Sequence, residues 1–276
     1  MKQLIKILVL FVQFDQMKFN HSFKTLQNSL EKYKNYEFKY LVIDNSINYE
    51  YFSEKEKNVF VINGDNSERE FSGWTRGLIK VRELELNYQV ALFINEAYIA
   101  YNDSYIDKYF NIAVKRCLRH NAAVGLFDKN ETGRELISKD LTFKKWLRSN
   151  IVLLPNQILT KLDSFIFISN SEFEEIIPAE FPQNVNTYND YFSDSIMIND
   201  EFKFKIFNWL TNQWHSRFDL NPQNWGLFRM KAKAIINEAL FGQTINFMGF
   251  KTLWYAPRFI VYFNKLIRKI SIRIRN

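Results

Sequence analysis

Polar side chains that could hold a ligand follow each of four short apolar runs in the first hundred residues. The runs span residues 6–12, 38–44, 58–63 and 88–95, and each has the length of a buried strand. Carboxylate and carboxamide side chains stand at or just after their ends: Gln13, Asp44, Asn45, Asn63, Asp65, Asn66, Asn95 and Glu96. In an open parallel α/β sheet, ligands bind beyond the carboxyl ends of the strands. The same chemistry at all four ends therefore predicts a ligand site at one edge of a sheet.

The third of these ends opens a segment suited to phosphate groups. Residues 63–78 read NGDNSEREFSGWTRGL and hold three of the eight glycines of the chain. Glycine permits close approach of the backbone to a ligand, and the guanidinium groups of Arg69 and Arg76 match phosphate oxygens. We therefore expect this segment to form the wall of a pocket for a phosphorylated ligand.

Helical spacing alternates with the apolar runs along most of the chain. Helices are expected at residues 20–33, 71–86, 104–120, 199–213 and 230–241, and a further strand at 122–127. Residues 143–155 indicate a loop that leads into another strand or helix, and residues 168–198 indicate a long loop. This order predicts an α/β fold with a mostly parallel sheet flanked by helices, followed by C-terminal helices.

Composition favours one large domain without a membrane span. Of the 276 residues, 47% are hydrophobic, which supports a substantial core. The apolar run at residues 6–12 is expected to be a first strand rather than a signal peptide, because Asp15 follows it closely and a small-residue cleavage site is missing. The single cysteine, Cys117, indicates a reducing compartment, and it is either a helix core residue or a nucleophile beside His120.

The charge excess of the chain is concentrated in its last residues. The net charge is +7, from 37 basic and 30 acidic residues, and seven of the basic residues lie from position 251 onward, where no acidic residue occurs. A helix over residues 257–276 would place an apolar arc opposite most of these cations. The arc would consist of Phe259, Phe263, Leu266, Ile267, Ile270 and Ile274. Such a helix lies on anionic membranes, and its Ile and Phe residues favour lipid over nucleic acid. The alternative is a helix docked on its own domain.

The order of the motifs resembles the nucleotide-sugar half of family-2-like glycosyltransferases with the GT-A fold, which build bacterial surface polysaccharides such as capsule and O-antigen. In that family a strand ends in an Asp-Asn turn, an Asn/Gly-rich segment opens a helix, and a later strand ends in an acidic DxD-type motif. The matching stretches here are VIDNS (42–46), residues 63–78 and ALFINE (91–96). The resemblance covers residues 5–100, with weaker agreement to about residue 240, and implies a Rossmann-like GT-A domain.

The resemblance also implies a division of the chain and a set of donor contacts. Its parts would be a nucleotide-sugar donor-binding half at 1–103, an acceptor-binding half of the same domain at 104–250, and the basic helix at 251–276. Asp44 would accept a hydrogen bond from the base or ribose, and Asp65 or Asn66 would help hold the base. Trp74 would either stack on the base or anchor its helix in the core. The implied donor-binding residues are Gln13, Asp44, Asn45, Asp65, Asn66, Arg69, Trp74, Arg76, Asn95 and Glu96.

The chain departs from the family at the motif that binds metal. The family has an acidic residue at the third position of this motif, where it binds Mg²⁺ or Mn²⁺ at the diphosphate, and this chain has Ala97. Asn95 and Glu96 supply one carboxylate between them. The sequence therefore predicts either weak metal binding through Glu96, or metal independence with basic side chains neutralising the leaving group.

An inverting transfer also needs a general base near the acceptor hydroxyl, and in the family this carboxylate follows the DxD-type motif at some distance. The candidates for this role are Asp190, Asp194 and Asp200, with Glu201 and Asp128 as further possibilities. Asp200 and Glu201 also suit the first turn of a helix, where acids face the positive end of the helix dipole. Arg148 and Asn150, in WLRSN, are expected either in the acceptor cleft or in a solvent-facing loop.

Together these features predict an enzyme, a bacterial glycosyltransferase. It would move a sugar from a nucleotide-sugar donor to a growing, lipid-linked surface glycan, as a cytoplasmic protein at the inner face of the membrane. One alternative is a non-catalytic or degenerate protein that binds nucleotide-sugar or glycan. Another is a sugar nucleotidyltransferase, which needs a glycine-rich loop after its first strand, whereas VQFDQMKFN (12–20) has no glycine.

Overall fold

The computed structural model describes residues 4–14, 21–98, 104–213 and 219–256, and its centre is a mixed, mostly parallel sheet of eight strands. The strand order is β10-β6-β9-β5-β1-β2-β4-β3, and β9 and β3 run opposite to the other strands. The strands are β1 (Ile5–Gln13), β2 (Tyr36–Asp44), β3 (Phe52–Glu56), β4 (Val59–Asn63), β5 (Val90–Asn95), β6 (Ala123–Lys129), β9 (Lys145–Pro155) and β10 (Thr252–Trp254). The predicted α/β class is confirmed, and the arrangement is compatible with a Rossmann-like fold.

The central strands are continuous apolar runs because both faces of the sheet are covered. In β1, Val9 and Phe11 face one hydrophobic cluster, and Leu8 and Leu10 face another. The expected first strand at residues 6–12 is thus β1, which lies between β2 and β5.

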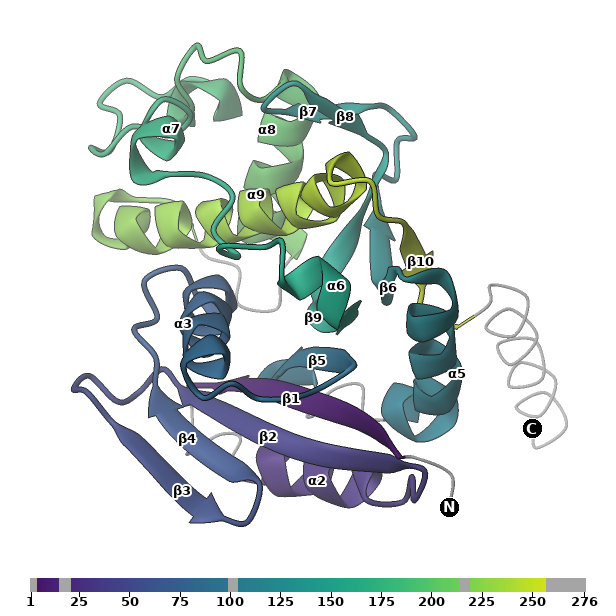
Figure 1. Ribbon diagram of the computed structural model, residues 1–276. Helices are drawn as coiled ribbons and strands as arrows, with labels where there is room; N and C mark the ends of the chain where they lie inside the picture. Colours follow the sequence, from purple (N-terminus) through teal and green to yellow (C-terminus); the bar gives the residue numbers. More distant parts are fainter. Residues whose placement is uncertain (1–3, 15–20, 99–103, 214–218, 257–276) are drawn as a thin grey trace, which may run out of the picture.

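Helices cover the two faces of the sheet (Figure 1). Leu26 of α2 (Ser22–Leu30) and Phe110 of α5 (Ser104–His120) belong to the first cluster. The second cluster holds Trp74 of α3 (Glu70–Glu83), Ile158 of α6 (Asn156–Leu159) and Phe241 of α9 (Trp225–Phe247). The helices predicted at 71–86 and 104–120 are confirmed, whereas the one predicted at 230–241 is longer at both ends.

A third layer packs against the side of α9 that faces away from the sheet, as Figure 1 shows. Its core includes Trp146 of β9, Phe202 of α8 and Phe228 of α9, so α9 is buried between two layers. The elements of this layer are β7 (Leu136–Ser138), β8 (Leu141–Phe143), α7 (Asn170–Glu174), η1 (Tyr188–Tyr191), α8 (Asp200–Asn208), η2 (Trp209–Gln213) and η3 (Pro222–Asn224). Residues 168–198, predicted as a long loop, contain only α7 and η1.

Two predictions on single features have different outcomes. Cys117 is fully buried on α5, and burial raises the pKa of its thiol above the usual range, so it is a core residue and not a nucleophile. The segment predicted as a basic helix at 251–276 begins instead with strand β10, whose residues 252–254 pair with β6, and residues 257–276 lie outside the described residues. Within the described part of the chain, none of the helices combines the length and apolarity needed to cross a bilayer.

Candidate functional site

The polar strand ends predicted from the sequence meet at one edge of the sheet. Asp44 at the end of β2 is opposite Gln13 of β1 and Asn63 of β4, and Asn95 of β5 is opposite Val12. The order of the parallel strands reverses between β1 and β5, since the chain first adds β2 and β4 on one side of β1 and then β5 on the other. Ligands bind at such a reversal, beyond the carboxyl ends of the strands.

A cavity of about 430 Å³ opens at this edge. Gln13 and Asp44 supply polar groups to its lining, while Phe23, Tyr49 and Tyr51 supply aromatic rings. Lys55, also in the lining, lies with its Nζ 5.6 Å from the centre of the Tyr51 ring. The cavity therefore combines flat apolar surfaces with a few fixed polar groups, as small-molecule sites do.

The carboxylate of Asp44 is held in place by neutral donors. Gln13 Nε2 donates to its Oδ2 at 2.9 Å, and the backbone N–H and hydroxyl of Ser46 donate to its Oδ1 at 3.0 and 2.6 Å. Asp44 is 2% exposed, so these bonds replace water around the carboxylate. The side chain is thus held in one orientation at the wall of the cavity.

The segment between β4 and α3 is joined to the end of β2 by the backbone N–H of Gly64, which donates to the carbonyl oxygen of Asp44 at 2.8 Å, and by the side chain of Asn45. Its Nδ2 donates to the carbonyl oxygen of Arg69 at 3.2 Å and to Oδ1 of Asn66 at 3.4 Å. Asn66 and Arg69 both have positive φ, 54° and 56°, which residues other than glycine rarely adopt. The segment therefore holds a conformation that local preference disfavours and that the bonds from Asn45 stabilise.

Two glycines make room for the Asn45 side chain. A Cβ atom on Gly64 would lie 1.8 Å from Oδ1 of Asn45, and a Cβ atom on Gly73 would lie 3.2 Å from the same atom. The glycines noted in the sequence thus bring backbone close to Asn45, and in this structure the close approach is to protein rather than to a ligand.

Cationic side chains of α9 lie against the same segment. Lys233 forms a buried ion pair with Glu68, and Asn170 also accepts a hydrogen bond from it. Burial raises the pKa of Glu68, against the opposing effect of Lys233. Burial also lowers the pKa of Lys231 to about 8, and the positive charge of Arg69 acts in the same direction. Arg69 and Lys231 therefore form a cationic pair at the carboxyl edge of the sheet.

A group of carboxylates surrounds Ser149 of β9. The Ser149 hydroxyl lies 2.7 Å from Oε1 of Glu70 and 2.8 Å from Oε2 of Glu238. The pKa of Glu238 is raised to about 7, chiefly by burial and also by the charges of Asp128 and Glu70, while the Ser149 hydrogen bond and Arg148 oppose the shift. Because Ile151 of β9 is opposite Ile94 of β5, Ser149 lies just beyond the carboxyl end of β5. This group is thus on the same edge as Arg69.

Sequence reasoning missed Lys231 and Glu238, because helical spacing alone gave α9 no chemical role. The available signal was the set of charges in KAKAIINEAL (231–240), an otherwise apolar stretch of helix. Charged residues inside a buried helix are uncommon unless they are paired, so such a pattern marks positions with specific partners.

Several predicted donor contacts are engaged elsewhere. Trp74 is fully buried and makes edge-to-face contacts with Phe71 and Phe93, so its ring has no free face for a base. Arg76 donates to Glu50 at 2.5 Å and to Asn63 at 3.0 Å, which commits it to the protein surface beside the cavity. Of the two roles expected for Trp74, the structure therefore shows the core anchor and not the stacking on a base.

The remaining residues of the 63–69 segment and the DxD-like motif have local roles. Asp65 is exposed and accepts from the backbone N–H and hydroxyl of Ser67, both at 2.9 Å. The Asn95 side chain accepts from the backbone N–H of Tyr98 at 3.0 Å, and Glu96 is 8% exposed. In the described ranges, no group of three His, Cys, Asp or Glu side chains is arranged to hold a metal ion. The donor set around Asn95 and Glu96 does not fit the metal site of the resembled family.

The carboxylates predicted as general bases lie in the third layer. Asp190 accepts from the backbone N–H groups of Asn186 and Thr187 at 2.7 and 2.6 Å, which lowers its pKa, and it caps η1. Asp200, in the first turn of α8, lies 3.7 Å from Lys203, and Asp194 is exposed. These residues cap helices or face solvent, so the carboxylates at the sheet edge, Glu70 and Glu238, replace them as candidates.

The predicted acceptor contacts do belong to the edge. Arg148 and Asn150 flank Ser149 on β9, and Arg148 Nε lies 3.7 Å from Oδ2 of Asp128. Asp128, a further candidate base, thus faces the group around Ser149 through Arg148.

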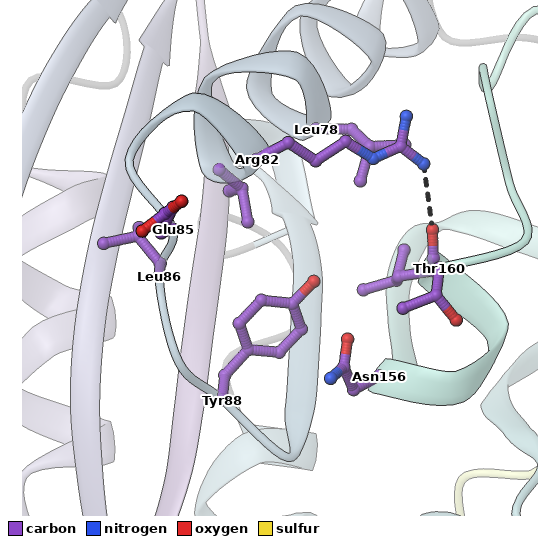
Figure 2. A pocket seen from close by; sticks show the side chains of 9 residues that line it. Leu78, Arg82, Glu85, Leu86, Tyr88, Asn156 and Thr160 are labelled. Carbon is purple, nitrogen blue, oxygen red and sulfur yellow. Dashed lines mark hydrogen bonds between the residues drawn. The ribbon is translucent and has the colours of Figure 1, made fainter.

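A second cavity, of about 170 Å³, lies at the opposite edge of the sheet, between the end of α3 and the start of β5. In Figure 2, Arg82 reaches from α3 toward the segment that carries Thr160, with the Tyr88 ring and Asn156 below it. The Arg82 guanidinium donates to the carbonyl oxygens of Leu159 and Leu162 at 3.2 and 2.6 Å. Its charge is thus used to join α3 to the turn after α6.

A substitution at Gly64 tests the role of Asn45. Gly64→Ala would force the Asn45 amide from its place, and we expect a loss of about 1–3 kcal/mol in the free energy of unfolding, measured by urea denaturation. Asn45→Ala removes the amide that would clash with the added methyl group. It should therefore lower the free energy of unfolding less in the Gly64→Ala variant than in wild type. Gly226→Ala is the matched control, because no atom lies within 4 Å of its added Cβ. Wild-type stability of Gly64→Ala would contradict this account.

No family model matches the chain, and no match is found among curated proteins. The chemistry of the carboxyl edge is therefore the basis for assigning a function. That edge combines a cavity with aromatic and polar lining, a cationic pair and a carboxylate pair.

Proposed function

We propose that the protein is a glycosyltransferase that uses a nucleotide-sugar donor. The observation that carries the proposal is the cavity of about 430 Å³ at the carboxyl ends of β1 and β2, lined by Gln13, Asp44 and three aromatic rings. The sequence resemblance to GT-A glycosyltransferases and the mostly parallel sheet support the same reading. The acceptor-binding half would begin after β5 and include β9, where Arg148 and Asn150 flank Ser149.

The cavity suits the nucleoside part of the donor. Rings such as Tyr49 and Tyr51 can stack on a base, and the fixed carboxylate of Asp44 can accept from a base N–H or a ribose hydroxyl. Gln13 holds this carboxylate and has a side-chain oxygen of its own for a further contact. The proposed positions of the diphosphate and the acceptor depend on a nucleoside bound in this cavity.

The diphosphate would lie against Arg69 and Lys231. Two cations at one edge can offset the charge that develops on a departing phosphate, which is the task a metal performs in the resembled family. Because the donor set at Asn95, Glu96 and Ala97 does not fit such a metal, we assign this task to the chain's own basic side chains. Lys231 is suited to it, since an incoming anion would favour its charged form.

The acceptor is proposed to be a growing, lipid-linked glycan at the inner face of a membrane. The support is the basic, apolar pattern of residues 257–276 in the sequence. In this arrangement the C-terminal segment would bring the sheet edge close to its substrate.

Nucleotide binding tests the cavity directly. In a thermal-shift screen of nucleoside mono- and diphosphates, we expect at least one diphosphate to raise the melting temperature. Asp44→Asn should weaken that ligand about tenfold to a hundredfold, since a hydrogen bond to a charged group contributes about 1.5–3 kcal/mol. Asp194→Asn, the same change at an exposed position, should leave affinity unchanged. Equal affinity of both variants would contradict the assignment of Asp44, and no shift with any nucleotide would contradict the function.

Metal independence gives a second test. Transfer from the identified donor should persist in excess chelator, and Lys231→Gln should lower kcat/KM about tenfold to a hundredfold. In the free enzyme kcat/KM should fall as pH rises through about 8, because Lys231 loses its charge there. Lys161→Gln, at an exposed position in the turn after α6, is the control. Complete loss of transfer in chelator, restored by Mg²⁺ or Mn²⁺, would overturn metal independence; binding without transfer or hydrolysis would favour a non-catalytic binding protein.

Membrane association is tested with the full chain. Replacing Arg268, Lys269, Arg273 and Arg275 by Gln removes four charges, each contributing about 1 kcal/mol near an anionic surface. We expect at least tenfold weaker co-sedimentation with anionic vesicles and little binding of either protein to neutral vesicles. The membrane role would be refuted by equal binding of wild type and the variant to anionic vesicles.

A further inference from the structure

The contacts of Ser149 constrain the number of protons near it. Its Oγ lies within hydrogen-bond distance of Glu70 Oε1, at 2.7 Å, and of Glu238 Oε2, at 2.8 Å. A serine hydroxyl has one hydrogen, so it can donate to only one of the two oxygens. The other contact is a hydrogen bond only if that carboxyl group carries a proton and donates it to Oγ.

The surroundings decide which carboxyl group carries the proton. Glu70 is in the first turn of α3, where the positive end of the helix dipole favours a charged carboxylate. The other oxygen of Glu238, Oε1, accepts from the indole N–H of Trp146 at 3.1 Å, which leaves Oε2 as the donor to Ser149. The chain of donors therefore runs from Glu238 to Ser149 and from Ser149 to Glu70.

We propose that Glu70, Ser149 and Glu238 form a proton-holding site at the carboxyl edge of the sheet, and that it takes up the proton of the acceptor hydroxyl. The second part rests on the proposed function. The first part concerns the protein alone and can be tested without substrate.

Some charged groups on the neighbouring elements raise the pKa of Glu238, and others lower it. Asp128 of β6 and Glu70 of α3 disfavour a second negative charge, whereas Arg148 of β9 favours it. Lys205 of α8 lies over the ring of Trp146, with its Nζ 5.0 Å from the ring centre. Burial is the largest influence, and together these influences raise the pKa of Glu238 from 4.5 to about 7. Near neutral pH the pair therefore alternates between one proton and none.

The proposed transfer uses the form without a proton. The acceptor O–H bond breaks and its proton moves to Glu238, while the acceptor oxygen forms a bond to the anomeric carbon of the donor sugar. The bond from that carbon to the phosphate oxygen breaks, and its electron pair leaves with the nucleoside phosphate beside Arg69 and Lys231. The pair then holds one proton, as the contacts of Ser149 require, and releases it to solvent before the next transfer.

The proton-holding site predicts how stability depends on pH. Glu238 has a higher pKa folded than unfolded, so its contribution to stability is complete below pH 4.5 and is lost as pH rises through about 7. The test measures the free energy of unfolding by urea denaturation between pH 5 and pH 8. Glu238→Gln, which resembles the protonated side chain, should match wild type at the low end and exceed it at the high end. Glu175→Gln, at an exposed position, should keep the wild-type dependence.

A second variant, Glu70→Gln, tests whether Glu70 and Glu238 share one proton. It remains informative if Glu238→Gln does not fold. Glu70→Gln removes the neighbouring negative charge and should move the midpoint of the stability loss down by about one pH unit. Glu68, whose pKa burial also raises, is unchanged in every variant and cancels in the differences. If the stability of Glu70→Gln is lost at the same pH as that of wild type, Glu70 and Glu238 do not share a proton. If the stability of Glu238→Gln depends on pH as that of wild type does, the proton-holding site is overturned.

Activity then separates the two parts of the proposal. With the donor identified, wild-type kcat/KM should rise with pH through the same midpoint that stability reports, and Glu238→Gln should lower it at least a hundredfold. If the stability differences are as expected but Glu238→Gln keeps the kcat/KM of wild type, the proton-holding site stands and its role in transfer is overturned. If no transfer is found at all, the proposed function fails and the site remains.

Discussion

The hydrogen bonds of Asn45 are the constraint on which the carboxyl edge of the sheet depends. Asn45 follows β2 directly, and its amide fixes the turn that ends in Arg69, where the backbone has a disfavoured positive φ. Gly64 and Gly73 make that position possible by leaving space around the amide. Because Glu68, Arg69 and Glu70 are consecutive, one fixed turn sets the place of the ion pair with α9, the cationic pair and the carboxylate pair together.

Helix α9 supplies the second half of this arrangement. It is buried between the sheet and the third layer, yet it directs Lys231, Lys233 and Glu238 toward the edge. A buried ion pair is weak support for stability, but it specifies how two elements meet, and Lys233 with Glu68 would do so here. The low exposure that positions these charges also changes their pKa values, which moves Lys231 and Glu238 toward neutral pH.

Much of the sheet and its polar edge could be predicted, because apolar runs report burial and parallel strands align their ends. The short strands β3, β7, β8 and β10 lack such runs, and the direction of β9 depends on a partner that is distant in sequence. The site is harder, since its contacts join residues 165 positions apart in Glu68 and Lys233 and 89 apart in Ser149 and Glu238. Local patterns also misplaced Asp190, which suits a catalytic loop by type but caps a helix, and they left the role of Trp74 open between base and core.

Hydrogen–deuterium exchange of the full chain, with and without a saturating nucleoside diphosphate, tests the central claim that the nucleotide binds at the carboxyl edge. We expect slower exchange over residues 42–51 and 63–70, which hold Asp44, both tyrosines of the cavity and the turn fixed by Asn45. Residues 82–88 and 156–160, which line the cavity at the opposite edge, should be unchanged. Protection confined to those residues, or no protection with any nucleotide, would contradict the account.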